Sequence, residues 1–179
     1  MKNLLYTMLI IFFSVNNITA QWIDYITQDS CFRIQFPGQP QVMNLKSGYG
    51  IDSTQIYSYS DTQGNYYYSL TVFHVSKERF HPESNEEKRF ELLKGLATAS
   101  IGLVGNILST EKITLQGYPG IFVTGETTQG IKEPYPPVFV KSYLVENRIY
   151  QLMVPCSHEN KENKEKDIFF NSFELTLKK

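Results

Sequence analysis

VFVKSYLVENRIYQLMV, residues 138–154, is the stretch that decides the fold. Apolar and β-branched residues dominate two runs, Val138–Glu146 and Arg148–Val154, and this composition is typical of strands. Only the turn Glu146-Asn147-Arg148 connects the runs. A connection this short cannot contain a crossover helix, so it predicts an antiparallel pair.

Further segments on the N-terminal side of this pair have the pattern of strands. Phe32, Ile34 and Phe36 alternate with polar residues and so predict one apolar face. The short, glycine-containing run 61–65 predicts a hairpin between two of the other segments. The strands predicted before residue 138 are Cys31–Phe36, Gly50–Ser60, Tyr66–Val75, Ile107–Leu115 and Gly120–Thr128.

Two segments follow a helical period instead. Ser84 and Glu87 have the spacing of a helix N-terminal capping box. The apolar residues that follow recur at three- and four-residue steps, which predicts an amphipathic helix over Asn85–Leu103. A charged run that ends in phenylalanines predicts a second helix over His158–Ser172. The predicted class is α+β, a mainly antiparallel sheet flanked by helices in an α/β/α sandwich.

The N-terminus has the form of a secretory signal peptide. Lys2 is followed by an apolar stretch, Leu4–Val15, and small Ala20 suits cleavage before Gln21. The stretch is shorter than the ~20 apolar residues that cross a bilayer, so no stable membrane span is expected after processing. We therefore expect a signal peptide over residues 1–20, a single domain over 21–179, and export to the periplasm or the medium.

Charge and cysteine content restrict the function further. The chain has 17 Lys and Arg against 18 Asp and Glu, without the basic excess of a nucleic-acid-binding protein. Cys31 and Cys156 are the two cysteines. In an oxidising compartment they form either a disulfide or two separate thiols, and the sequence leaves both alternatives open.

Sequence signatures of catalysis and metal binding are absent. Cys156 and His158 are close in sequence, but residues two apart at a strand end often diverge, so a half-cystine or buried thiol is favoured over a catalytic pair. His74, His81 and His158 lack the short spacings of zinc ligands. We predict no catalytic residues, no metal site and no cofactor.

Tyrosines are concentrated in the first predicted hairpin, and one more lies in a proline-rich loop. Such side chains offer amphipathic surface to a sugar, a peptide or a partner protein. The alternative is that cross-strand aromatic pairs stabilise the sheet, and strand propensity favours it. The candidate binding surface consists of Tyr57, Tyr59, Tyr66, Tyr68 and Tyr135.

Four short motifs, in this order, resemble the PsbP-like superfamily, which also contains Mog-type Ran-binding proteins and exported bacterial proteins of unknown role. They are Phe32-x-Ile34-x-Phe36-Pro37-Gly38-x-Pro40, Gly117-Tyr118-Pro119-Gly120, Arg148-x-Tyr150-x-Leu152 and Phe169-x-x-Ser172-Phe173. The resemblance implies an antiparallel sheet between helices. It implies no particular function, because members of a fold serve different roles.

The sequence thus favours an exported, non-enzymatic binding or accessory domain with an unknown protein or small-molecule partner in the cell envelope. One alternative is an enzyme whose site is assembled from separated residues. Another is a structural envelope component that forms a stable oligomer.

Overall fold

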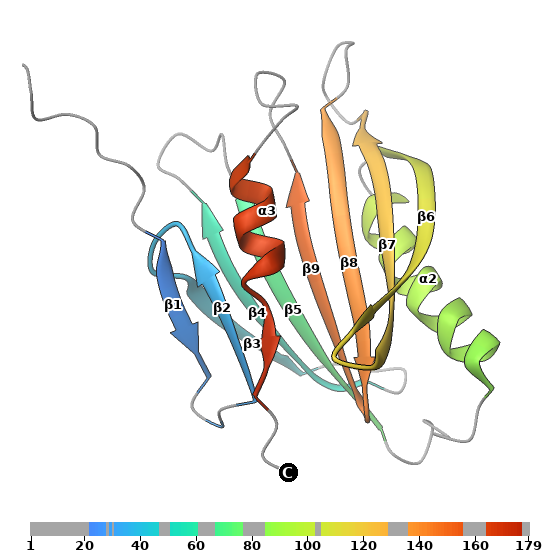
Figure 1. Ribbon diagram of the computed structural model, residues 1–179, viewed down its shortest axis with the longest axis horizontal. Helices are drawn as coiled ribbons and strands as arrows, with labels where there is room; N and C mark the ends of the chain where they lie inside the picture. The colour runs from blue at the N-terminus through green and yellow to red at the C-terminus, as the bar shows by residue number, and fades with distance from the viewer. Residues whose placement is uncertain are drawn as a thin grey trace, which may run out of the picture.

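The protein is described here by a computed structural model, which covers residues 22–27, 29, 31–46, 51–60, 67–76, 85–102, 105–128, 136–155 and 164–176 (Figure 1). The predicted signal peptide, residues 1–20, lies outside these ranges. So does the predicted hairpin turn at 61–65.

A seven-stranded sheet with the order β3-β4-β5-β9-β8-β7-β6 forms the centre of the fold. All its described pairings are antiparallel, as predicted. Glu146 has a φ of 53° in the turn between β8 and β9, a left-handed conformation that closes the two-residue connection. The strands are β3 (Gln41–Lys46), β4 (Ile51–Ser60), β5 (Tyr67–Val75), β6 (Gly105–Leu115), β7 (Tyr118–Thr127), β8 (Pro137–Val145) and β9 (Arg148–Pro155).

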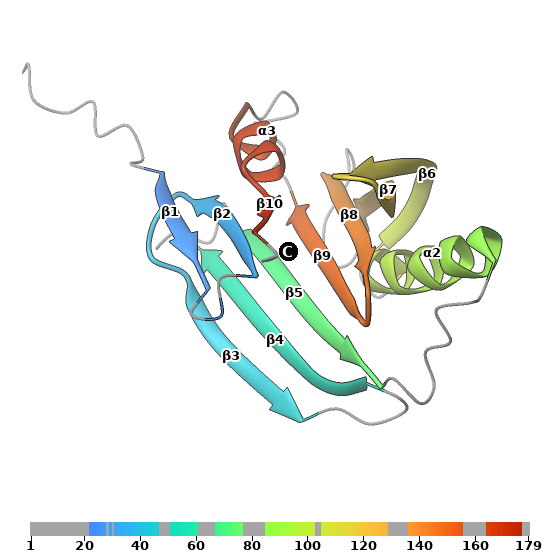
Figure 2. The same ribbon diagram turned by 60° about the horizontal axis from the view of Figure 1, so that its bottom comes forward.

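One face of this sheet is covered by helix α3 (Lys164–Asn171) and by a small sheet with the order β1-β2-β10 (Figure 2). The small sheet consists of β1 (Ile23–Ile26), β2 (Phe32–Phe36) and β10 (Glu174–Leu175). The apolar face predicted for Phe32, Ile34 and Phe36 is buried here, in a core shared with α3.

Helix α2 (Glu86–Gly102) covers the other face, beneath β7 and β8. Leu93, Ala97 and Ile101 are its buried residues. Successive residues of β9 alternate between the two cores, with Ile149 facing α2 and Tyr150 facing α3. The predicted antiparallel α/β/α sandwich is therefore confirmed.

The structure corrects some details. The Oδ1 atom of Asn85 accepts the N–H of Lys88 at 3.0 Å, so Asn85 caps α2, whereas Ser84 lies outside the described residues. The described part of helix α3 runs over Lys164–Asn171, whereas residues 156–163, which include the predicted start at His158, lie outside the described residues. The sequence analysis did not predict β1, β3 and β10.

Candidate functional site

A hollow with a volume of about 430 Å³ opens between the small sheet and the β3 edge of the large sheet. We call it the tyrosine hollow. Three segments supply its walls: β1 with the residues that follow it, the edge strand β3, and β4. The lining residues are Tyr25, Thr27, Asp29, Val42, Asn44, Gln55 and Tyr57.

The register of β3 and β4 positions four of these side chains. Val42 is directly opposite Tyr57, and Asn44 is directly opposite Gln55. Residues opposite each other in an antiparallel pair project from the same face, as do residues two apart along a strand. The four side chains therefore form a two-by-two array that faces β1. Tyr25 of β1 lines the hollow opposite this array.

The two tyrosines form an aromatic corner. The ring centroids of Tyr25 and Tyr57 are 5.4 Å apart, with the ring planes tilted by 56°. Burial first, and the neighbouring Tyr25 next, raise the pKa of Tyr57 to about 12. Burial also raises the pKa of Tyr25. Both hydroxyls therefore stay protonated and neutral, and Tyr57 donates its hydroxyl proton to Oε1 of Gln55 at 3.2 Å.

The array also contains amide groups without protein partners. Across the described ranges, no hydrogen bond engages the side chain of Asn44 or the Nε2 group of Gln55. Side-chain amides donate and accept hydrogen bonds. A ligand with hydroxyl groups can therefore form hydrogen bonds with both amides.

A polar network forms the end of the hollow nearest to β9. The backbone N–H of Cys31 donates to Oγ1 of Thr27 at 3.1 Å and to Oδ1 of Asp29 at 3.2 Å. The Cys31 thiol donates to Oδ2 of Asp29 at 2.9 Å. Arg148 contacts both groups, with Nη1 2.7 Å from Sγ of Cys31 and 3.4 Å from Oδ2 of Asp29.

In this network the pKa of Asp29 is lowered and the pKa of the Cys31 thiol is raised. Burial alone would raise the pKa of Asp29, but hydrogen bonds from Cys31 and Thr27 and the charge of Arg148 bring it below the usual value. Burial first, and Asp29 next, raise the pKa of the Cys31 thiol, and Arg148 opposes this rise. The carboxylate is therefore ionised while the thiol is protonated. Asp29 is the charged residue that lines the hollow, and Arg148 offsets its charge at 3.4 Å.

The structure places the predicted tyrosines in different surroundings. Tyr57 lines the hollow. Tyr59 is half-buried against the core, and its ring lies over Gly38. Tyr68 is fully buried, and its ring packs against Trp22 and Phe169. The prediction that Tyr68 presents a binding surface is therefore wrong, because its side chain belongs to the core. Tyr66 and Tyr135 lie outside the described residues.

Of the two cysteines, whose pairing the sequence left open, the structure describes Cys31. Cys31 is half-buried and carries a free thiol. Cys156 and the neighbouring His158 lie outside the described residues.

Sequence reasoning missed Tyr25, Asp29, Asn44 and Gln55. Tyr25 and Asn44 lie on the two strands that were not predicted, β1 and β3. The available signal was weak, because every residue of β3 is exposed and no apolar face marks the strand.

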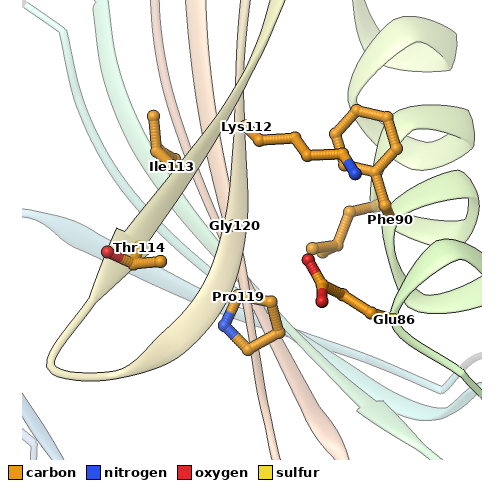
Figure 3. A pocket seen from close by; sticks show the side chains of 8 residues that line it. Glu86, Phe90, Lys112, Ile113, Thr114, Pro119 and Gly120 are labelled. Atoms are coloured by element: carbon orange, nitrogen blue, oxygen red, sulfur yellow. The ribbon is translucent and has the colours of Figure 1, made fainter.

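A second hollow, of about 210 Å³, lies between the start of α2 and the β6–β7 hairpin (Figure 3). Lys112 reaches from β6 towards α2, and its Nζ lies 4.7 Å from the centroid of the Phe90 ring. Glu86 projects into the same space (Figure 3). This hollow is smaller than the tyrosine hollow and its cation already has an aromatic partner, so it is the weaker candidate.

Metal binding and membrane spanning have no support in the described ranges. No group of three or more His, Cys, Asp or Glu residues there could hold a metal ion. No helix in the same ranges combines the length and the apolar character needed to cross a membrane.

Comparisons with known proteins identify the fold. No protein-family model and no curated protein sequence matches the chain. Among solved structures, the solution structure of the cyanobacterial PsbP protein CyanoP from Synechocystis sp. PCC 6803 is similar, with a TM-score of 0.54 and 12% identity over 90% of this chain and 97% of that one. LpqN, involved in cell envelope biogenesis of Mycobacterium tuberculosis, is similar with a TM-score of 0.52 and 12% identity over 88% of this chain and 91% of that one.

These similarities confirm the PsbP-like fold that the four sequence motifs predicted. At 12% identity they establish the fold and carry no residue roles to this chain. The relation to Mog-type proteins stays a prediction.

Proposed function

We propose that this chain is an exported, non-enzymatic binding domain of the cell envelope, and that its ligand site is the tyrosine hollow. The ligand class is a small neutral molecule, or the end of a longer chain, that is rich in hydroxyl groups, as a sugar is. The observation that carries the proposal is the combination of the Tyr25–Tyr57 corner with amide groups that lack protein partners.

The chemistry of the lining supports this ligand class. The half-buried ring of Tyr25 provides flat apolar area against which the C–H face of a sugar ring can pack, whereas the Tyr57 ring is 5% exposed and supports Tyr25 from the core. The amides of Asn44 and Gln55 can donate to and accept from hydroxyl groups. The volume of about 430 Å³ is within the usual range for small-molecule sites. The charge of Asp29 is offset by Arg148, so the lining presents no unpaired charge, which suits a neutral ligand.

The proposed envelope location is supported by the predicted signal peptide and by the similarity of fold to LpqN. Export predicts a mature protein that begins at Gln21, which intact mass measurement on the fractionated host can establish. A full-length protein beginning at Met1 and recovered from the cytoplasm would contradict this part of the proposal.

Nucleophilic catalysis by Cys31 is disfavoured by the state of its thiol. A nucleophilic cysteine requires a lowered pKa, so that the thiolate is present at neutral pH. Burial and Asp29 raise the pKa of Cys31 instead. The reactive side chain next to the hollow is therefore held in its unreactive form.

Calorimetric titration with a panel of neutral oligosaccharides of about three sugar units tests the proposal, since this size suits the hollow. We expect at least one member to bind. Replacing Asn44 by Ala should weaken its binding about tenfold, the usual effect of losing one or two ligand hydrogen bonds.

Gln41→Ala is the matched control. Gln41 is an exposed amide on the same strand, but it lies an odd number of residues from Asn44 and therefore projects from the opposite face. This variant should bind normally. If no oligosaccharide binds, or if both variants lose binding equally, the proposed ligand site is wrong.

A further inference from the structure

The second hollow, between α2 and the β6–β7 hairpin, is lined by one acidic and one basic side chain (Figure 3). Glu86 is the first residue of α2, and Lys112 lies on β6. The rest of the lining is mainly apolar and includes Phe90, Leu93 and Pro119. Opposite charges therefore meet an apolar wall in a single small space.

Both charged residues occupy positions that face the core. Lys112 is directly opposite Ile121 in the pairing of β6 with β7, and Ile121 is buried together with residues of α2. Directly opposite residues project from the same face of a sheet, so Lys112 projects towards α2. Glu86 precedes Phe90 by four residues and the buried Leu93 by seven, which places all three on one side of the helix. An amphipathic helix normally has apolar residues on this side, so Glu86 is an exception to the pattern.

Phe90 shows that the two charged groups are close in space. Residues four apart on a helix have Cβ atoms about 5–6 Å apart, so Glu86 is a neighbour of Phe90. The Nζ of Lys112 lies 4.7 Å from the centroid of the Phe90 ring. One small molecule in the hollow can therefore contact both charged groups.

Neither Glu86 nor Lys112 has an ion-pair partner within the part of the chain that the structure describes, and they form no ion pair with each other. The contact with Phe90 involves one side of the Lys112 ammonium and leaves N–H donors available on the other sides. The hollow thus offers N–H donors from one side chain and acceptor oxygens from the other.

We propose that this hollow binds a free α-amino acid with an apolar side chain. The carboxylate of the ligand accepts hydrogen bonds from Lys112, and its ammonium group donates to Glu86. Its side chain packs against Leu93 and Pro119. The volume of about 210 Å³ is below the usual range for small-molecule sites, which limits the ligand to about the size of one amino acid. This site has its own ligand class and does not depend on the function proposed above.

The test is an NMR titration of the folded protein with leucine, leucinamide and N-acetylleucine. Leucinamide lacks the carboxylate and N-acetylleucine lacks the ammonium group, while both keep the apolar side chain. We expect leucine to cause saturable shifts in the backbone amide signals of Phe90 and Lys112. Each blocked derivative should bind about tenfold more weakly, because it leaves one charged group of the hollow without a partner.

Two variants assign the ends of the ligand to the two side chains. Lys112→Gln and Glu86→Gln should each weaken leucine binding about tenfold. Lys112→Gln should not weaken the binding of leucinamide, because this derivative has no carboxylate for Lys112 to bind. Glu86→Gln should not weaken the binding of N-acetylleucine, because its ammonium group is blocked. Such paired dependence would not arise from a general loss of folding.

Glu87→Gln is the matched control. Glu87 is also an exposed acidic residue in the first turn of α2, but it does not line the hollow. This variant should bind leucine normally.

The proposal is overturned if leucine causes no saturable shift, or if either blocked derivative binds as tightly as leucine. It is also overturned if Glu87→Gln weakens leucine binding as much as Glu86→Gln does.

Discussion

The guanidinium of Arg148 donates a hydrogen bond to the sulfur of Cys31, with 2.7 Å between Nη1 and Sγ. Arg148 begins β9 in the large sheet, whereas Cys31 directly precedes β2 in the small sheet. This contact therefore links the two sheets next to Asp29, which lines the tyrosine hollow. The Asp29 carboxylate strengthens this link, because it accepts hydrogen bonds from both Cys31 and Arg148.

The first prediction concerns the reactivity of Cys31, followed by mass spectrometry of iodoacetamide alkylation in a Cys156→Ser background. Asp29→Asn should speed the reaction at about pH 8, because it removes a carboxylate that raises the pKa of the thiol. Arg148→Gln should slow it, because it removes the cation that lowers this pKa. An unchanged or slower rate in Asp29→Asn would show that the carboxylate does not control the thiol.

The second prediction is that both cysteines of the unreduced mature protein are free. Strand β9 runs from Arg148, which contacts Cys31, to Pro155, which precedes Cys156 in the sequence. At about 3.3 Å per residue these two ends are about 23 Å apart. A disulfide requires Cα atoms within about 7 Å. Thiol titration under denaturing conditions should find two thiols, and finding none would show that the cysteines pair.

Strands β4, β5, β7, β8 and β9 of the large sheet could be predicted from the sequence because they bury many of their side chains. Alternation along β2, and the short turn between β8 and β9, were sufficient to place those strands. Strand β3 is exposed along its whole length and shows no such alternation. Strand β10 has two residues, which pair with Arg33 and Phe32 from the other end of the chain. Pairing between distant segments leaves no local pattern to read.

The candidate site was less predictable than the fold for the same reason. The tyrosine-rich hairpin was visible, but the sequence could not separate Tyr57, a core residue that also lines the hollow, from Tyr68, which is fully buried and lines no part of it. Both are strand residues of the same type. The two residues differ in which segments pack against them. These segments include the small sheet, whose strands come from both ends of the chain.

The third prediction concerns two glycines with opposite roles. A Cβ at Gly120 would clash with Cδ1 of Tyr143 and would lie 2.9 Å from the backbone oxygen of Ser142. Because Tyr143 is buried, Gly120→Ala should lower the free energy of unfolding by about 1–3 kcal/mol. Gly95 is exposed on α2 with no atom within 4 Å of its Cβ position, so Gly95→Ala should raise that free energy by about 1 kcal/mol. Urea denaturation measures both, and equal effects of the two variants would contradict the packing around Gly120.

The fourth prediction is that His74 titrates below 6.5, measured by NMR of its ring protons. Burial first, and Arg148 next, lower its pKa, while Asp29 and Asp52 oppose the shift. Because the folded-state pKa is below the unfolded value, the contribution to stability is complete above about pH 6.5 and is lost as the pH falls through the folded value.

Arg148→Gln is the informative variant for His74, because Arg148 is directly opposite His74 in the pairing of β5 with β9. The substitution should raise the pKa of His74 and leave it below 6.5, since burial remains. A titration at or above 6.5 in the unmodified protein would mean that His74 is not buried in this way.

The tyrosine hollow is tested most directly by two-dimensional NMR of the side-chain amide groups of Asn44 and Gln55 during titration with neutral oligosaccharides. The account predicts that these two NH₂ signals shift and saturate together, while the amide signals of Asn106 and Gln116, which lie on and after β6, stay in place. Saturable shifts confined to residues around Phe90 and Lys112, or no shift at Asn44 and Gln55 with any sugar, would contradict it.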